Sequence, residues 1–506
     1  MENHNAFTQS EETFHEMMTF LANTESKRLD LSGIEGFLVQ QGRTLCRQLL
    51  LAHLAERGVG DVGAYVIGSD GVKRTHKRPL KRTILTVFGS IVITRMAYSK
   101  PTLSSLFPLD AMLNLPPHKI SYTLQKHFVL DVIDRSFQKS SQAIARWTGV
   151  TITNRQAQAI VHDASHEFAN FYDIRVVKEA EAARTLPLLI VTSDGKGVFV
   201  KIDVLRPATR KKARQKNRVK KACLAHAEQT SSKRIATVAS VYEIARYIRQ
   251  PSDIAADFFP QTPPVPMKEE RPKPCAKRVW AGLEASGKAV VDTIFQEALH
   301  REGHQNKEWV VLVDGDLHQI KHFHQMAETY HIALTIVCDM VHVLRYLWKA
   351  GKAFYAHEAA AQWVSGKLHE ILQGNSRRVA AGMRRWATRR HLAKSVRKPI
   401  DDCARYLVNH TPYLQYQSYL KKGYPIATGV IEGTCRYLVK DRMEITGARW
   451  GLQGAEALLK LRAIHTSGDF DEYWQFYQTT QYEKHYKILY QNSDDLKPNN
   501  LLHESS

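Results

Sequence analysis

The sequence predicts an α/β fold in which a mixed sheet is interrupted by an all-helical insertion and preceded by a mixed α+β N-terminal region. Two apolar runs, residues 310–313 and 332–337, each lead into a helix-period segment, which is a β-α-β-α pattern. A third run at residues 186–193 supplies an earlier strand. Residues 343–425 have helical periodicity throughout, so they insert helices beside the sheet and do not extend it.

The charge of the chain points to a polyanionic partner. The 506 residues exceed one ordinary core, and the formal net charge is +21. Such a charge attracts nucleic acid, here double-stranded DNA, although ribosome-associated and membrane-surface proteins share it. The six cysteines are widely spaced, as expected for reduced thiols in the cytoplasm. No apolar run approaches the roughly 20 residues of a membrane-spanning helix, so no membrane partner is expected.

The N-terminal region combines helices with strands. Residues 8–57 have helical periodicity and stop before Gly58 and Gly60. Residues 65–68 and 83–98 are β-branched and predict strands. The basic residues 72–82 between them fit either a phosphate-contacting hairpin or a solvated loop.

Residues 119–180 contain a helix-turn-helix pattern. A helix is expected over 140–147, a tight turn over 148–150, and Thr153 as the N-cap of a second helix. The second helix would present Asn154, Arg155 and Gln156 to base edges in the major groove. Ordinary helical bundles use the same turn, so the pattern alone leaves both interpretations open.

Three acids are candidates for a metal-dependent catalytic site. Asp194 and Asp314 each follow an apolar run, and Glu432 lies near the start of a helix. Carboxylates at one edge of a sheet can hold two Mg²⁺ ions, or Mn²⁺, for phosphodiester chemistry. Asp316 is close enough to replace Asp314. The structural alternatives are an Asp-Gly turn at a strand end and an acid that favours a helix N-terminus.

Two further groups could support such a site. Asp339 and His342 form Asp-x-x-His at a strand-to-helix junction, where they would orient the acids or serve as an N-cap with a packed histidine. Residues 206–221 carry nine Lys or Arg, among them Arg210, Lys211 and Lys212. That segment would hold a phosphate backbone without reading sequence, or be a solvated loop.

Four motifs in this chain resemble those of a known group. TSDGKG around Asp194, VLVDGD around Asp314, CDMVH around Asp339 and above all GVIEGTCRYLVKDRMEITGARWGLQGAEALLKLRA around Glu432 are similar to bacterial insertion-sequence transposases of the ISKra type, relatives of the Mutator-like DDE enzymes. The likeness covers roughly residues 80–475. It implies an RNase H-like catalytic core and metal-dependent strand cleavage and transfer at terminal inverted repeats.

The resemblance also implies how the chain is divided and used. The expected parts are a helical and β-hairpin region (1–118), a helix-turn-helix DNA-binding region (119–180), the first part of the RNase H-like core (181–342), the helical insertion (343–425), the second part of the core with Glu432 (426–466), and a C-terminal helix and tail (467–506). The implied triad is Asp194, Asp314 and Glu432. The Asp339 and His342 pair matches a signature of the Mutator-like enzymes.

Further DNA contacts are expected near Glu432. Arg436 and Lys440 follow it by one and two helical turns and would meet the scissile phosphates, while Arg449 and Trp450 would grip the element ends. Synapsis of two ends implies a homodimer or higher assembly on DNA, in the cytoplasm and associated with the bacterial nucleoid. A catalytically inactive DNA-binding regulator, or a structure-selective nuclease without strand transfer, would share these features.

Overall fold

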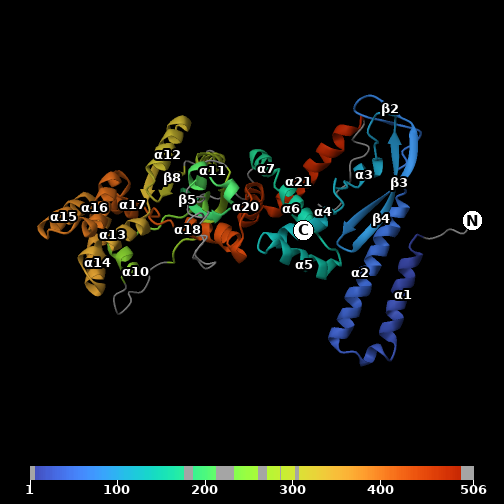
Figure 1. The fold of residues 1–506 in the computed structure, drawn as a ribbon, viewed down its shortest axis with the longest axis horizontal. Helices are drawn as coiled ribbons and strands as arrows, with labels where there is room; N and C mark the ends of the chain where they lie inside the picture. The colour runs from blue at the N-terminus through green and yellow to red at the C-terminus, as the bar shows by residue number, and fades with distance from the viewer. Residues whose placement is uncertain are drawn as a thin grey trace, which may run out of the picture. The chain divides into compact units, whose positions relative to one another are not determined.

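The computed structural model describes residues 6–175, 186–211, 233–259, 270–284, 287–302 and 307–491. The chain forms two compact units, one made of Met1–Glu167 and Phe470–Ser506, the other of Phe168–Asp469 (Figure 1). The C-terminal helix, expected in a part of its own, therefore belongs to the first unit. The expected boundary between residues 180 and 181 lies outside the described residues.

The first unit joins a long helical pair, two small β-sheets and several short helices. Its elements are α1 Thr8–Ala22, α2 Leu31–Glu56, β1 Val66–Ile67, β2 Lys73–Arg74, β3 His76–Thr86, β4 Gly89–Ser99, α3 Pro108–Met112, α4 Tyr122–Val132, α5 Phe137–Thr148, α6 Asn154–Ala164 and α21 Phe470–His485. The predicted N-terminal helices are confirmed. They end before Gly58 and Gly60, whose φ angles are both 73°, a conformation that favours glycine.

The basic residues 72–82 belong mostly to a strand. β3 pairs antiparallel with β4 as far as Thr86 and Gly89, so the strands predicted over 83–98 are parts of the two arms of a hairpin. The loop interpretation of the basic segment is wrong. Part of its charge is neutralised internally, because Lys77 lies 2.6 Å from Asp61 and Arg82 lies 2.9 Å from Asp110.

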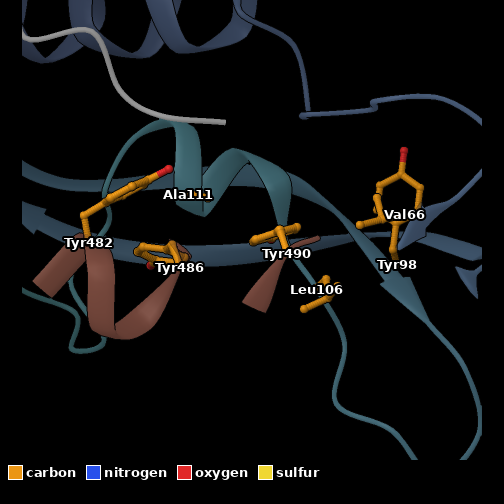
Figure 2. Packing of buried hydrophobic residues seen from close by; sticks show 7 residues of the cluster. All are labelled: Val66, Tyr98, Leu106, Ala111, Tyr482, Tyr486 and Tyr490. Carbon is orange, nitrogen blue, oxygen red and sulfur yellow. The ribbon is translucent and has the colours of Figure 1, made fainter. Parts of the chain in front are cut away.

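A tyrosine-rich cluster ties the C-terminal helix to the hairpin region of the first unit. Tyr482, Tyr486 and Tyr490 pack with Val66, Tyr98, Leu106 and Ala111 (Figure 2). Burying such large side chains contributes substantially to stability, because aromatic residues remove more apolar area from water than other residue types. Segments at opposite ends of the sequence thus share one core.

The helix–turn–helix geometry over residues 137–164 follows the local sequence signals. Gly149 ends α5 in the left-handed region with φ 71°, and Thr153 caps α6 in a reciprocal capping box with Gln156. The predicted helices and the predicted N-cap are therefore confirmed as local structure.

The second unit contains the mixed sheet and most of the helices. Its elements are α7 Phe168–Ile174, β5 Leu188–Phe199, β6 Lys233–Ile244, α10 Pro251–Phe258, β7 Cys275–Gly282, α11 Gly287–Glu302, β8 Glu308–Val313, α12 Leu317–Tyr330, β9 Leu334–Cys338, α13 Met340–Phe354, α14 His357–Leu372, α15 Ser376–Arg389, α16 Lys394–Asn409, α17 Tyr416–Lys421, α18 Gly429–Thr434, a π-helix Cys435–Lys440, α19 Asp441–Met443 and α20 Leu452–Ser467.

The five strands lie in the order β7-β6-β5-β8-β9. β5, β6 and β7 pair antiparallel, whereas β8 and β9 continue the sheet parallel to β5. The sheet is therefore mixed, as predicted. From Trp309 to Val313, β8 is apolar and buried, as is typical of a central strand covered on both faces.

Two strand predictions need correction. The sequence predicts that the strand over 186–193 turns through Gly195 and Gly197, but β5 runs on to Phe199, because antiparallel pairing with β6 continues after the parallel pairing with β8 stops at Thr192. Asp194 therefore lies within a strand. The sequence of residues 279–300 predicts a helix, but its first residues belong to β7, whose buried side chains complete the sheet beside β6, and the helix α11 begins at Gly287.

The helical structure predicted for most of residues 343–425 is confirmed. Helices α13 to α17 pack on one another and are grouped beside the sheet within this unit (Figure 1). None of the described helices is long and apolar enough to span a bilayer.

Candidate active site

Two aspartates lie side by side where parallel pairing ends. The last paired position of β5 and β8 is Thr192 with Leu312, and Asp194 and Asp314 each follow it by two residues. Asp194 lies within β5 and Asp314 directly follows β8, and the charge of Asp314 helps to raise the pKa of Asp194, so the two carboxylates lie near each other. The strand register thus brings together two of the three predicted acids.

Asp194 is partly enclosed. Its Oδ1 accepts a hydrogen bond from the Gly195 amide at 2.6 Å, and the Cys435 thiol lies 3.7 Å from its Oδ2. Burial raises the pKa of Asp194, and the charges of Asp314 and Glu432 raise it further. A bound cation would relieve this like-charge repulsion.

The two acids of the Asp314-Gly-Asp316 turn have different partners. Asp316 is the N-cap of α12, and its Oδ1 accepts from the amides of His318 at 2.7 Å and Gln319 at 3.3 Å. The Asp314 Oδ1 accepts from the Asp316 amide at 3.0 Å, a bond within the turn itself. The carboxylate of Asp316 is thus committed to the helix, and that of Asp314 lies beside Asp194.

The helical insertion holds the backbone of this turn. The Tyr406 hydroxyl donates to the Asp314 carbonyl at 3.0 Å, and His410 Nε2 donates to the Gly315 carbonyl at 2.8 Å. Gly315 has φ 101°, and a Cβ there would lie 2.7 Å from the Tyr406 hydroxyl. α16 therefore fixes the turn that carries Asp314, which the sequence did not reveal.

Asp339 anchors the helix that carries Glu432. Its buried carboxylate accepts hydrogen bonds from the Val341 amide at 3.0 Å and from the Thr428 amide at 3.2 Å. Thr428 directly precedes α18. The Met340 amide also donates to the Ile426 carbonyl at 2.9 Å. Burial raises the pKa of Asp339. The Asp339 side chain therefore serves as the N-cap of α13, and it also fixes the start of α18, the helix that carries Glu432.

His342 packs within a row of aromatic rings. Its ring centroid lies 5.9 Å from that of Tyr406 and 5.5 Å from that of Tyr346. Tyr406 in turn stacks on His410 at 4.2 Å. The described contacts of His342 are those of the packed histidine considered as the structural alternative.

Glu432 approaches Asp194 through its own helix. Cys435, which touches Asp194, follows Glu432 by three residues and so shares its helical face. The carboxylate of Glu432 is held by Arg345 of α13 at 2.5 Å, and both side chains are partly exposed. The ligand oxygens of Asp194, Asp314 and Glu432 do not all lie within 4.8 Å of one another. Glu432 would have to turn from Arg345 to complete a ligand set.

The donor types nevertheless suit a hard divalent cation. All three side chains offer carboxylate oxygens, the ligands that Mg²⁺ prefers. Burial is the main cause of the raised pKa of Asp194, and the nearby charges of Asp314 and Glu432 add to it. The residues present therefore fit Mg²⁺ or Mn²⁺, with Asp194 and Asp314 already adjacent.

The segment after Glu432 departs from the expected helix. Residues 435–440 form a π-helix, in which hydrogen bonds run from residue i to i+5. Lys440, at the end of the π-helix, therefore does not keep the α-helical spacing from Glu432 that the sequence suggested, whereas Arg436 stands near its start. Both are exposed, and Arg436 lies 3.8 Å from Asp441.

Trp450 is not available to grip DNA as expected. It is 8% exposed, and its indole NH donates to the Met443 carbonyl at 2.9 Å. Its backbone also bonds with Phe199 and Lys201, which closes the end of β5. Trp450 is part of the core, whereas Arg449 is exposed.

Among the other predicted DNA contacts, some side chains are exposed and others form hydrogen bonds within the chain. Asn154 and Arg155 are exposed at the start of α6, but the Gln156 side chain accepts from the Thr153 amide at 2.9 Å. The Arg210 guanidinium donates to the Leu205 carbonyl, and Lys211 is exposed. Lys212 and most of the basic segment 206–221 lie outside the described residues.

A basic helix face was not among the predicted DNA contacts, although its spacing is readable in the sequence. Helix α15 contains no acid, and the exposed arginines along it are Arg377, Arg378, Arg384, Arg385 and Arg389. Counted from Arg377, the other four arginines follow after one, seven, eight and twelve residues, and this spacing places all five on one side of an α-helix. This arginine face gives the helical insertion a strongly positive surface.

A comparison with protein-family models finds no match, and a comparison with curated proteins finds no significant relative.

Proposed function

We propose that this chain is a DNA transposase that binds the terminal inverted repeats of its own insertion sequence and performs metal-dependent strand cleavage and strand transfer. The observation that carries the proposal is the register of β5 and β8, whose last pair, Thr192 and Leu312, lies two residues before Asp194 and Asp314, together with the approach of Glu432 through Cys435. The mixed sheet with two parallel strands beyond an antiparallel group is consistent with an RNase H-like core.

Each acid has a defined task in this proposal. Asp194, Asp314 and Glu432 would bind two Mg²⁺ ions, which supply activation of the attacking oxygen and stabilisation of the leaving oxygen. Asp314 is the second acid because Asp316 caps α12. Tyr406 and His410 hold the turn of Asp314, and Asp339 holds the helix of Glu432, so these three residues position the acids.

Two surfaces support DNA binding. Helices α5 and α6 have the geometry of a helix-turn-helix with Asn154 and Arg155 exposed for base contacts. The arginine face of α15 suits phosphate groups, because guanidinium groups bind them in a bidentate manner. A homodimer or larger assembly would bring two DNA ends together in the bacterial cytoplasm, in association with the nucleoid.

The test is cleavage of duplex DNA that carries the element ends. Asp194→Asn, Asp314→Asn and Glu432→Gln should each abolish Mg²⁺-dependent nicking while DNA binding persists. Asp316→Asn is the matched control, since an asparagine still caps α12 and is predicted to keep activity. Full activity of Glu432→Gln, or loss of activity only in Asp316→Asn, would reject the assignment.

An inactive DNA-binding regulator is the second candidate, and one observation favours it. The Glu432 carboxylate is held by Arg345 and does not face the two aspartates closely enough to complete a ligand set. In that case the wild-type chain binds the ends without nicking them at any Mg²⁺ or Mn²⁺ concentration. A nuclease without strand transfer would instead nick the DNA but yield no joined product.

A further inference from the structure

A second group of possible metal ligands belongs to the first unit, whereas the carboxylates belong to the second. His162, Asp163 and His166 each offer one ligand atom, and these atoms all lie within 4.8 Å of one another. His162 and His166 are one helical turn apart, and their rings meet edge to face with centroids 4.5 Å apart. All three side chains are accessible to solvent, so an ion could enter without unfolding the region.

The hydrogen bonds around this group prepare it for a metal. His166 Nδ1 lies 3.2 Å from the His162 carbonyl, which can only accept, so Nδ1 carries the proton and Nε2 presents a lone pair. Metal-binding histidines commonly use their second ring nitrogen in this way. Asp163 Oδ2 lies 2.8 Å from His118 Nε2, an interaction that orients the carboxylate from a separate segment.

The position in the fold also favours a cation. His162 and Asp163 lie in the last turn of α6, and His166 follows directly after it. The C-terminal end of a helix carries partial negative charge, which attracts cations within about one turn. Two imidazoles and one carboxylate are a donor set suited to Zn²⁺, with water completing the coordination.

We propose that His162, Asp163 and His166 bind one Zn²⁺ ion, with His118 orienting Asp163. The ion would link the end of α6 to the loop of His118 and stabilise the first unit. This site is independent of the proposed transposase chemistry, which uses carboxylates of the second unit. The sequence signal is His-Asp-x-x-His, whose two histidines are four residues apart.

The test is a Zn²⁺ titration of the full chain without a polyhistidine tag, by calorimetry in excess Mg²⁺ so that the carboxylate site is occupied. The wild type should bind one Zn²⁺ that His162→Ala/His166→Ala loses. His118→Ala should retain the site with about 10-fold to 100-fold weaker affinity, as when an outer partner of a metal ligand is removed. Asp163→Asn should also weaken binding.

The matched control is His318→Ala/His324→Ala, which removes two exposed histidines from α12 in the other unit. It should bind Zn²⁺ like the wild type. Zn²⁺ should also raise the melting temperature of the wild type and of this control, but not that of His162→Ala/His166→Ala. Equal Zn²⁺ affinity in the two double variants, or no binding by the wild type, would overturn the proposal. Because neither measurement involves DNA, failure here is distinct from failure of the proposed function.

Discussion

The Thr428 amide donates a hydrogen bond of 3.2 Å to the buried carboxylate of Asp339, although the two residues are 89 positions apart. Asp339 stands at the end of β9, and Thr428 stands directly before α18. The helical insertion therefore leaves the sheet and returns to it at one carboxylate. Glu432 follows four residues after this junction, so its placement depends on Asp339.

Replacing Asp339 should separate an anchoring role from a metal-binding role. Asp339→Ala leaves the Thr428 and Val341 amides without their acceptor, which should cost about 1–3 kcal/mol of unfolding free energy and greatly reduce nicking. Asp339→Asn keeps an acceptor oxygen and should stay close to wild type in both respects. Denaturant unfolding and a nicking assay measure the two effects. Loss of activity in Asp339→Asn with normal stability would show that its charge is needed.

A methyl group at Gly315 should disturb the turn of Asp314. The φ angle of 101° disfavours an L side chain, and the added Cβ would lie 2.7 Å from the Tyr406 hydroxyl. Gly315→Ala should therefore destabilise the chain by more than about 1 kcal/mol and reduce the rate of cleavage. Gly374→Ala is the control, because Gly374 has φ 87° but a Cβ there would meet no other atom within 4 Å. Equal losses in both variants would mean that backbone strain alone is responsible.

Asp194→Asn should raise stability while it abolishes cleavage. Burial, then the charges of Asp314 and Glu432, raise the pKa of Asp194 above its usual 3.8. At a pH between the usual pKa and the raised one, Asp194 is protonated in the folded chain and ionised in the unfolded chain. Stability therefore falls as pH rises through this window. The variant should thus melt above wild type at neutral pH, with the difference vanishing below pH 3.8. Mg²⁺ should raise the melting temperature of the wild type more than that of Asp194→Asn; the reverse order contradicts the metal assignment.

The arginine face of α15 should contribute salt-sensitive DNA affinity. The triple variant Arg378→Ala/Arg385→Ala/Arg389→Ala should have a shallower plot of log binding constant against log salt concentration. Its negative slope should shrink in size by up to about three, roughly one for each arginine that neutralises a phosphate. Fluorescence anisotropy with duplex DNA at several salt concentrations gives the slope. Arg397→Ala/Arg405→Ala is the control on the neighbouring helix α16, where both arginines pair with acids of the chain. An unchanged slope in the triple variant would remove α15 from the interface.

Glu297 should stabilise the second unit in a pH-dependent manner. Burial opposes its charge, but Arg301 and Arg278, each 2.7 Å from its Oε1, lower the pKa of Glu297 below the usual 4.5. Its stabilisation is therefore complete above pH 4.5 and is lost as pH falls through the lower folded value. Glu297→Gln should cost about 3–5 kcal/mol at neutral pH, because it removes the charge that buried Arg301 and Arg278 share, although Arg278 keeps its ion pair with Asp469. Thermal unfolding at several pH values should show that the stability difference between the wild type and Glu297→Gln becomes smaller in acid. A difference that stays constant with pH would exclude the ion pairs as its cause.

The sequence by itself determined the local structure. The apolar run of β8 is hydrophobic enough to be buried on both faces, and Thr153 with Gln156 carries its own capping chemistry, so both were predictable from neighbouring residues. The helical insertion was predictable for the same reason, since its periodicity is local. The charge spacing on α15 is equally local and can be read from the sequence.

Tertiary structure decided what depends on strand register and on residues far apart in the chain. Asp194 lies inside β5 because β6 extends the pairing after β8 stops, and the turn of Asp314 is held by Tyr406 of α16, whose hydroxyl donates to the Asp314 carbonyl. Trp450 is buried where its backbone amide donates a hydrogen bond to the Phe199 carbonyl at the end of β5. These outcomes depend on long-range hydrogen bonds, whose partners no local pattern identifies.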